Sequence, residues 1–282
     1  MNQKYKSARS SLREISVRPD KRFGQNFITD SEVVSKIVQF AEPSGDDTIV
    51  EIGPGLGALT ESLAAIRPNL TVIEIEPELA QKLKVRFPEI TVLQQDVRQV
   101  EFQSLGRDLV VFGNLPYSFS TEIVFHLIES AATIKRAVIM LQREFVERMA
   151  AEPGGRDYGT LSIGVQLWCD LKLGPIISGD SFYPTTKVDS RVVELKFLKQ
   201  PRFEISDLKW FRKIVKASFS NRRKKLLNSL SAAGIWSKEI LTEVLQSLAI
   251  DPGRRAETLS IAEYVKLAEQ LRQLQPQAVK LT

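Results

Sequence analysis

Short apolar segments rich in β-branched residues alternate with helical segments through the first half of the chain, and this alternation constrains the fold most strongly. The apolar segments are residues 48–52, 70–75, 90–93, 109–112 and 137–141, and helical apolar spacing occupies 59–66, 78–87 and 121–130. Continuous apolar strands separated by helices are typical of a parallel sheet covered on both faces. We therefore expect an α/β domain, with late strands at 171–177 and 192–197 closing the sheet as an antiparallel hairpin.

The pattern changes after Pro201, where only helical spacing follows. Apolar residues recur at helical intervals near 210–219, 240–248 and 264–271, and Ser260 with Glu263 forms a capping-box pattern before the last segment. Residues 161–168 fit a helix or a strand equally well. We predict a flexible basic arm at 1–22, an α/β domain at 23–200 and a small all-α domain at 201–282.

Basic residues are concentrated in two segments. Residues 1–22 hold seven Lys or Arg and two acids, 196–225 hold eleven and two, and 23–195 hold 15 and 24. Two basic blocks around an acidic body favour a polyanionic partner, although each block alone also fits a solvated charged face. The arm also fits a transit peptide, except for its two acids. No apolar run approaches the roughly 18 residues of a membrane span, so we expect a soluble protein with no membrane partner.

Cysteine and histidine are each represented once, by Cys169 and His126. One of each supplies neither an internal disulfide nor a zinc site, so we expect a reducing compartment and no metal. His126 lies in an apolar helical pattern, and free cysteine is usually a small buried hydrophobe. Both residues are predicted to be structural, and a reaction that needs a histidine is not expected.

A glycine-rich loop, residues 51–57 (Glu-Ile-Gly-Pro-Gly-Leu-Gly), directly follows the first strand. Gly53 and Gly55 with Ala58 satisfy the dinucleotide pattern G-x-G-x-x-G/A, and Glu74 lies 21 positions beyond Gly53, where a ribose-binding acid belongs. The same geometry serves S-adenosylmethionine, whose ribose also offers hydroxyl groups to an acid. The glycine pattern alone therefore leaves a dinucleotide and S-adenosylmethionine open.

Acidic residues at the predicted strand ends separate these two ligands. Glu51, Glu74, Glu76 and Asp96 fall at the edge where open α/β sheets bind ligands. A pyrophosphate does not tolerate nearby carboxylates, whereas a sulfonium cation does. Each acid alone fits an exposed strand end, but three consecutive strand ends that carry them favour S-adenosylmethionine.

The segment Asn114-Leu115-Pro116-Tyr117, after the fourth strand, is the most specific feature. An exocyclic adenine amine is a weak nucleophile because its lone pair is delocalised into the ring. The Asn114 side-chain oxygen and the Leu115 carbonyl can each accept one amine hydrogen and favour a pyramidal nitrogen. Pro116 restricts Leu115 to extended conformations, and Tyr117 offers a face for stacking a base. The segment therefore predicts methyl transfer to an adenine amine without a general base.

Five segments in order resemble the motif series of the KsgA-type ribosomal RNA adenine dimethyltransferases. They are residues 21–27, 51–57, 94–96, 113–117 and 182–190. The resemblance covers nearly the whole chain. It implies a Rossmann-like S-adenosylmethionine-dependent methyltransferase sheet with a helical RNA-binding C-terminal domain. It also implies that the protein dimethylates two adjacent adenosines near the 3′ end of small-subunit ribosomal RNA, late in subunit assembly.

The resemblance also assigns roles to individual residues. Positions that match the family's cofactor contacts are Asn26, Ile28, Gly53, Glu74 (ribose), Asp96 (adenine) and Asn114, which also touches the target amine. We expect Gly55 of the glycine pattern to bind the cofactor as well. Phe182 matches an aromatic residue that sandwiches the target base together with Tyr117. Lys187 and Ser190 match positions for which we expect backbone or phosphate contact. Ser118-Phe119 departs from the commoner Asn-Ile, which puts the seating of the base in doubt.

The basic block at 196–225 gains a use from this resemblance. Arg222, Arg223, Lys224 and Lys225 are expected to grip RNA phosphates, as is Lys187. Because duplex RNA hides its base edges, the target adenosine must be unpaired or swung out of its stack. The expected partners are small-subunit ribosomal RNA and the assembling small subunit, for a cytoplasmic monomer.

Three other functions remain open from the sequence. The nearest is a methyltransferase of the same type that acts on large-subunit RNA and confers macrolide resistance. The second is an RNA-binding assembly or transcription factor that keeps the fold without turnover. The third is a nicotinamide-dependent dehydrogenase, which lacks an evident proton-transfer residue here.

Overall fold

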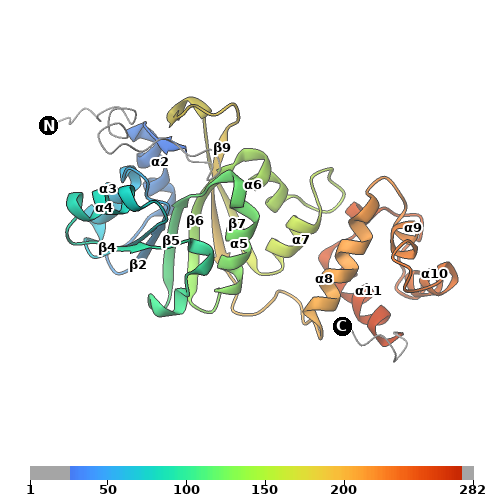
Figure 1. Ribbon diagram of the computed structural model, residues 1–282. Coiled ribbons are helices and arrows are strands. Elements are labelled where there is room, and N and C mark those ends of the chain that lie inside the picture. The colour runs from blue at the N-terminus through green and yellow to red at the C-terminus, as the bar shows by residue number, and fades with distance from the viewer. Residues whose placement is uncertain (1–25, 275–282) are drawn as a thin grey trace. The chain divides into compact units, whose positions relative to one another are not determined.

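The computed structural model describes residues 26–274 (Figure 1), so the predicted arm at 1–22 lies outside the described residues. The chain forms two compact units. Unit 1 comprises the described residues up to Val146 together with Cys169–Lys199, and unit 2 comprises Glu147–Trp168 together with the described residues from Gln200 to Leu274. The predicted single boundary near 200 assigns Glu147–Trp168 to the α/β domain, whereas in the structure this segment belongs to unit 2. Tyr158 and Ile163 explain the difference, because they are buried in the same hydrophobic cluster as the C-terminal helices.

Unit 1 is built on a seven-stranded sheet with the strand order β4-β3-β2-β5-β6-β9-β7. The strands are β2 (Thr48–Ile52), β3 (Thr71–Glu74), β4 (Thr91–Gln94), β5 (Leu109–Asn114), β6 (Ile134–Gln142), β7 (Cys169–Ile177) and β9 (Ser190–Phe197). The first five strands are parallel, and β9 pairs antiparallel with both β6 and β7. The expected α/β sheet with an antiparallel closure is confirmed.

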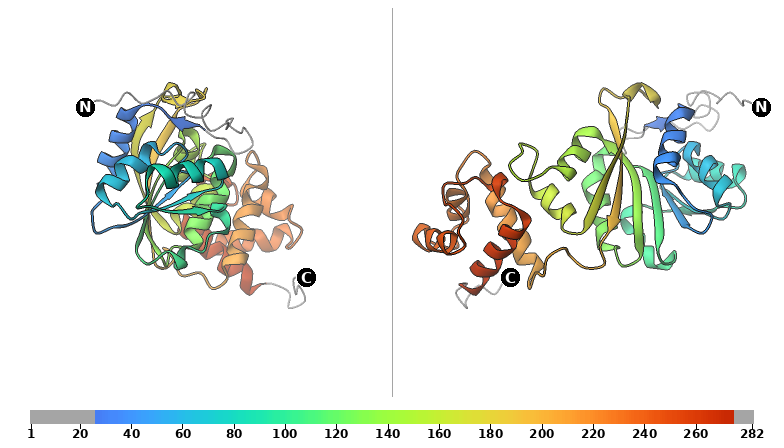
Figure 2. Two further views of the ribbon diagram at one scale, coloured as in Figure 1. Left: turned by 60° about the vertical axis from the view of Figure 1, so that its left-hand side comes forward. Right: turned by 180° about the vertical axis from the view of Figure 1, so that it is seen from behind.

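Helices lie on both faces of this sheet (Figure 2). They include α2 (Ser31–Ala41), α3 (Ala58–Ile66), α4 (Pro77–Arg86) and α5 (Ser120–Glu129), and α6 (Arg143–Ala150) follows β6. Asp30 caps α2, because its carboxylate accepts a hydrogen bond from the Glu32 backbone N–H at 2.9 Å. Val33, Val34 and Ile37 of α2 are buried in the core of unit 1. The helical spacing seen from Asp30 onward thus buries one face of α2, as predicted.

A second, two-stranded sheet was not predicted. It joins β1 (Phe27–Ile28) antiparallel to β8 (Phe182–Tyr183), with Ile28 opposite Phe182. Two-residue strands are too short to show the alternation that marks a strand in a sequence. The pairing holds the start of the described chain against a segment more than 150 positions away. A hydrogen bond from the Thr29 hydroxyl to the Ser181 carbonyl strengthens this connection.

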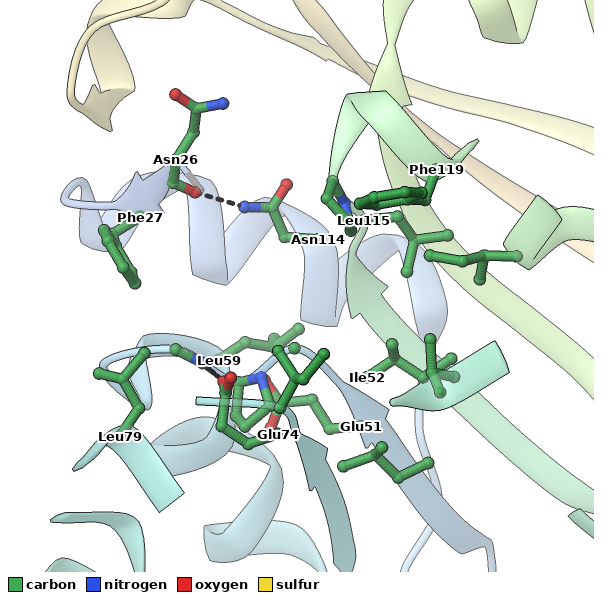
Figure 3. Close-up of a pocket in the computed structure, with 18 of the residues that line it drawn as sticks. Asn26, Phe27, Glu51, Ile52, Leu59, Glu74, Leu79, Asn114, Leu115 and Phe119 are labelled. Carbon is green, nitrogen blue, oxygen red and sulfur yellow. Dashed lines mark hydrogen bonds between the residues drawn. The ribbon is translucent and has the colours of Figure 1, made fainter. Parts of the chain in front are cut away.

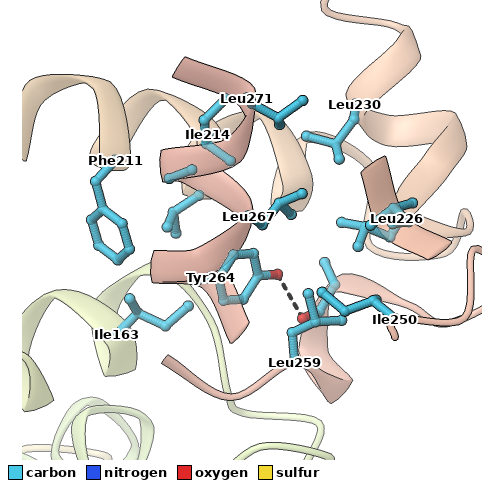
Figure 4. Packing of buried hydrophobic residues seen from close by; sticks show 14 of the residues in the cluster. Ile163, Phe211, Ile214, Leu226, Leu230, Ile250, Leu259, Tyr264, Leu267 and Leu271 are labelled. Carbon is cyan, nitrogen blue, oxygen red and sulfur yellow. Dashed lines mark hydrogen bonds between the residues drawn. The ribbon is translucent and has the colours of Figure 1, made fainter. Parts of the chain in front are cut away.

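Unit 2 is helical. Its helices are α7 (Thr160–Gln166), α8 (Leu208–Ser218), α9 (Leu226–Ser231), α10 (Lys238–Ser247) and α11 (Ile261–Gln273). The segment that fits a helix or a strand equally well is therefore mainly helix. Figure 4 shows Tyr264 among the buried aliphatic residues, where its hydroxyl donates to the Ala256 carbonyl at 2.7 Å. The predicted capping box of Ser260 and Glu263 begins α11.

The two rare side chains occupy structural positions. Cys169 is buried, and the His126 ring nitrogen lies 2.9 Å from the Val100 carbonyl with its ring packed on Phe102. Both predictions are confirmed. Within residues 26–274, every helix is too short or too polar to cross a membrane.

Candidate active site

A cavity opens at the carboxyl ends of β2, β3, β4 and β5 in unit 1, the edge where α/β sheets bind ligands. Figure 3 shows Asn26 and Asn114 on one side of it and Glu74 with Leu79 on the other. Ten of the predicted site residues line this cavity: Asn26, Ile28, Gly53, Gly55, Glu74, Asp96, Asn114, Leu115, Pro116 and Tyr117. Residues from five separate segments of the chain therefore meet in one place.

The glycine loop after β2 uses its own donors internally. Gly53 donates to the Ile73 carbonyl at 2.9 Å, and Gly55 donates to a Glu74 carboxylate oxygen at 3.1 Å. Gly55 has φ +56°, and an added Cβ would lie 2.9 Å from the Phe27 ring, so only glycine fits without a shift. A phosphate site at such a loop needs free backbone N–H groups. The loop thus gives a pyrophosphate little to bind, which argues against a dinucleotide.

Two carboxylates line the base of the cavity. Glu74, at the end of β3, is 4% exposed, and its oxygens accept from the Gly55 and Glu76 backbone N–H groups. Burial raises the pKa of Glu74, and these two hydrogen bonds oppose that rise. Glu51 is 2% exposed, and its Oε2 has no hydrogen-bond partner among the described residues. Burial raises the pKa of Glu51 to about 8, and the charge of Glu74 adds to this effect.

Asp96 follows β4 and begins a short 3-10 turn, η2 (Val97–Gln99). Its carboxylate accepts from the Arg98 backbone N–H at 3.0 Å and faces the Arg98 guanidinium, with Nη2 2.6 Å from Oδ2. These bonds lower the pKa of Asp96. The acid predicted to bind adenine is therefore ionised and is already held by Arg98, a residue that the sequence analysis did not select.

Asn114 ends β5 and is half-buried, and its side-chain Nδ2 donates to the Asn26 backbone carbonyl at 2.8 Å. Leu115 follows it, with its N–H donating to the Met140 carbonyl at 3.0 Å. Pro116 has φ −63° and ψ 132°. The segment is thus pinned to β6 at Leu115 and to the start of the described chain at Asn114.

Tyr117 begins a second 3-10 turn, η4 (Tyr117–Phe119), and is half-buried at the cavity. Its hydroxyl lies 2.7 Å from the hydroxyl of Ser190, at the start of β9. Ser190 is completely buried, which leaves no exposed surface for the phosphate contact that was one of its two expected roles. It fixes the ring of Tyr117 instead.

Phe182 corrects another expectation. Its side chain is 2% exposed, belongs to the hydrophobic core and does not line the cavity, so it cannot sandwich a base with Tyr117 in this arrangement. Its pairing with Ile28 explains the burial, because that pairing turns Phe182 towards the core. The aromatic residues that do line the cavity besides Tyr117 are Phe27 and Phe119. The sequence alone does not identify Phe27 or Phe119 as site residues, because their position at the cavity becomes apparent only in the folded chain.

The predicted RNA-binding side chains are all exposed. Lys187 lies on unit 1, and Arg222, Arg223, Lys224 and Lys225 lie just before α9 in unit 2. Arg222 differs from its neighbours, because its Nη2 donates to the carbonyls of Arg156 and Tyr158 at 2.5 and 2.7 Å. Arg222 therefore holds a loop of unit 2, which leaves the other three as the freer cations of the block.

The polar groups that line the cavity fit S-adenosylmethionine. The acid at the end of β3 suits ribose hydroxyls, and the buried Glu51 oxygen without a hydrogen-bond partner among the described residues leaves a polar atom for hydrogen bonding. An ionised carboxylate at Asp96 suits an adenine amine. The glycine loop offers few free donors to a pyrophosphate.

Solved structures agree with this assignment. A dimethyladenosine transferase from Plasmodium falciparum matches with a TM-score of 0.74 at 25% identity, covering 88% of this chain and 98% of that chain. The 23S rRNA methyltransferase ErmE matches with a TM-score of 0.66 at 25% identity, covering 88% of this chain and 100% of that chain. The fold and its site define an S-adenosylmethionine-dependent methyltransferase.

Sequence relatives narrow the class to a family. The family described as ribosomal RNA adenine dimethylase matches residues 17–273. A "Ribosomal RNA small subunit methyltransferase A" from Syntrophotalea carbinolica is 42% identical over 255 residues, which cover 89% of this chain and 96% of that protein. The chain belongs to the ribosomal RNA adenine dimethylase family.

Proposed function

We propose that the protein transfers methyl groups from S-adenosylmethionine to the exocyclic amines of two adjacent adenosines. These adenosines lie in the loop near the 3′ end of small-subunit ribosomal RNA and become N6,N6-dimethyladenosines during subunit assembly. The orientation of Asn114 carries this proposal. Because its Nδ2 donates to the Asn26 carbonyl, its Oδ1 is left as the acceptor for an incoming amine.

The target amine is activated by hydrogen bonding. Asn114 Oδ1 and the Leu115 carbonyl each accept one amine hydrogen, which weakens conjugation of the nitrogen lone pair with the ring. A following proline restricts Leu115 to extended conformations, and the Leu115 N–H donates to the Met140 carbonyl at 3.0 Å, so the Leu115 carbonyl stays in place. Fixed acceptors of this kind act without reorganisation as charge develops.

The bound cofactor supplies an electrophilic methyl group on a sulfonium. With the cofactor bound, the amine lone pair would form the new N–C bond as the C–S bond breaks, and the surplus proton would leave the nitrogen for water. The one histidine of the sequence, His126, lies against the Val100 carbonyl and does not line the cavity, so no imidazole is assigned a part in the step. Tyr117, fixed by Ser190, gives the target base a stacking face.

Residues on the sheet edge would hold the cofactor. Glu74 would accept from the ribose hydroxyls, Asp96 would accept from the adenine amine, and Gly53 and Gly55 would allow close approach of the backbone. Asn26 and Ile28 cover the site from the β1 side. The supporting observation is that all six residues line one cavity.

The helical unit is proposed to bind RNA. Three exposed cations just before α9, Arg223, Lys224 and Lys225, would neutralise phosphates, and Lys187 would do so from unit 1. A flipped or unpaired adenosine then enters the cavity. We propose that the protein acts as a cytoplasmic monomer where small subunits assemble.

Mass mapping of methylated nucleotides tests the function. Purified protein, tritiated S-adenosylmethionine and undermodified small subunits are expected to give two adjacent adenosines with two methyl groups each. Methylation of large-subunit RNA instead would favour a second candidate function, the 23S rRNA methylation for which ErmE is named. The structure of ErmE matches this chain at 25% identity. RNA binding without methyl transfer would indicate an assembly factor, and binding of a nicotinamide cofactor would indicate a dehydrogenase.

A further inference from the structure

Arg98 connects two parts of the cavity that are separate in the sequence. Its guanidinium faces the Asp96 carboxylate as a fork, with Nε 3.0 Å from Oδ1 and Nη2 2.6 Å from Oδ2. The Cζ atom lies 4.2 Å from the centroid of the Phe119 ring. All three residues line the cavity. The end of β4 is thereby joined to the turn that carries Tyr117.

This arrangement differs from an ordinary surface ion pair. Exposed pairs often contribute little, because two long side chains lose entropy when they are held together. Here the fork bonds two nitrogens to the short Asp96 side chain, whose exposed fraction is only 19%. The Phe119 ring supplies a flat surface for the guanidinium, so the arginine is positioned on two sides.

The Asp96 carboxylate is left with one orientation. Its Oδ1 accepts from the backbone N–H of Arg98 and its Oδ2 accepts from Nη2, while the single Nε hydrogen is shared between Oδ1 and Oδ2, at 3.0 and 3.1 Å, so three hydrogens meet the two oxygens. An ionised carboxylate can only accept hydrogen bonds, and each oxygen has two acceptor positions. A ligand that meets the remaining position must therefore bring a donor. An adenine amine does so, whereas the ring carbonyl of hypoxanthine presents an acceptor at the same place.

We propose that Arg98, seated on Phe119, is a positioning residue that makes the cofactor site specific for adenine over hypoxanthine by fixing Asp96. The inference rests on the proposed function only in that the cavity holds the adenosine part of S-adenosylmethionine.

The test measures binding rather than turnover. S-Adenosylhomocysteine and its deaminated analogue S-inosylhomocysteine are titrated against the full chain by calorimetry. The unchanged protein is expected to prefer the adenine ligand by about tenfold or more, the value of one hydrogen bond to a charged group. Arg98→Met is expected to weaken the adenine ligand about tenfold, leave the inosine ligand within about twofold, and so remove most of the preference.

Two further variants separate positioning from a general structural effect. Arg98→Lys keeps the charge but loses the fork, and Phe119→Leu keeps an apolar contact but loses the stacking surface, so both are expected to retain part of the preference. Arg272→Met makes the same change at an exposed arginine of unit 2 that pairs with Glu269 at 2.8 Å. It should leave both affinities unchanged.

Either of two results would overturn the inference. Equal weakening of both ligands by Arg98→Met would mean that Arg98 only supports the fold, and tighter binding of the adenine ligand would mean that Arg98 competes for Asp96. The proposed function is judged separately, from methylation of small-subunit RNA by the unchanged protein. A protein that discriminates the two ligands but methylates no such RNA would keep this inference and lose the function.

Discussion

The side-chain amide of Asn114 donates to the backbone carbonyl of Asn26, with 2.8 Å between Nδ2 and O, across 88 positions of sequence. This bond decides which end of the amide is free. An amide has one donor end and one acceptor end, so a donor bound to Asn26 leaves Oδ1 as the acceptor. The Asn26 carbonyl, at the start of the described chain, therefore determines that Asn114 presents its oxygen to a ligand at the end of β5.

Glu74→Gln is expected to weaken binding of S-adenosylhomocysteine by about ten- to a hundredfold, since hydrogen bonds to a charged group contribute about 1.5–3 kcal/mol. The amide nitrogen of glutamine cannot accept from the N–H of Gly55 or Glu76, each of which bonds one carboxylate oxygen now. Calorimetric titration measures the change. Glu89→Gln, an exposed residue outside the cavity, is the matched control. Unchanged affinity in Glu74→Gln would remove Glu74 from the cofactor site.

Glu51 is expected to make stability depend on pH. Its pKa rises from 4.5 to about 8 on folding, so the folded protein holds a proton that the unfolded chain loses between these values. The free energy of unfolding should therefore fall as pH rises from about 4.5 to 8 and level off above that range. The free energy of unfolding of Glu51→Gln should not show this fall. The stability of the variant relative to the unchanged protein should therefore increase by roughly 1–3 kcal/mol between pH 5 and pH 9.

Denaturant unfolding of the ligand-free protein at pH 5, 7 and 9 measures this difference. Glu89→Gln removes an exposed carboxylate and should follow the unchanged protein at each pH. Parallel curves for Glu51→Gln and the unchanged protein would mean that Glu51 is ionised in the folded state.

The basic block should divide into binding and structural residues. Replacing Arg223, Lys224 and Lys225 with Ala is expected to weaken RNA binding and to reduce the slope of log K against log salt by about 0.7–0.9 for each phosphate that the variant no longer neutralises. Filter binding across a salt series measures both. The same slope in the triple variant and the unchanged protein would mean that these side chains face solvent in the complex.

Arg222→Ala should act mainly on stability. Loss of its two bonds to the Arg156 and Tyr158 carbonyls is expected to destabilise unit 2 by about 1–2 kcal/mol. Thermal unfolding checks this value, with Arg272→Ala as an exposed arginine control. A normal melting profile together with a large loss of RNA affinity would return Arg222 to the binding surface.

The sheet could be predicted from the sequence because its strands are buried and continuous. Thr48–Ile52 was predicted with its observed bounds, and the parallel strands place their ends at one edge. That geometry also brought Glu74, Asp96 and Asn114 together. Apolar runs and strand ends are local features, so they can be recognised in a single sequence.

Contacts between distant segments could not be predicted in this way. The burial of Phe182 depends on its pairing with Ile28, and the bond from Ser190 to Tyr117 joins β9 to η4. The assignment of Glu147–Trp168 to unit 2 depends on packing against the C-terminal helices. Neither periodicity nor charge reports such contacts, so the motif position alone gave Phe182 a place beside the target base, whereas its side chain is buried outside the cavity.

Single-turnover methyl transfer by Asn114→Ala and Asn114→Asp, with saturating S-adenosylmethionine and RNA, tests the central claim most directly. Asn114→Ala removes the acceptor, and Asn114→Asp places a carboxylate against the Asn26 carbonyl. Both are expected to lower the rate by about a hundredfold or more, while affinities for RNA and S-adenosylhomocysteine change by less than about tenfold. Normal rates in either variant would contradict activation of the amine by this fixed acceptor.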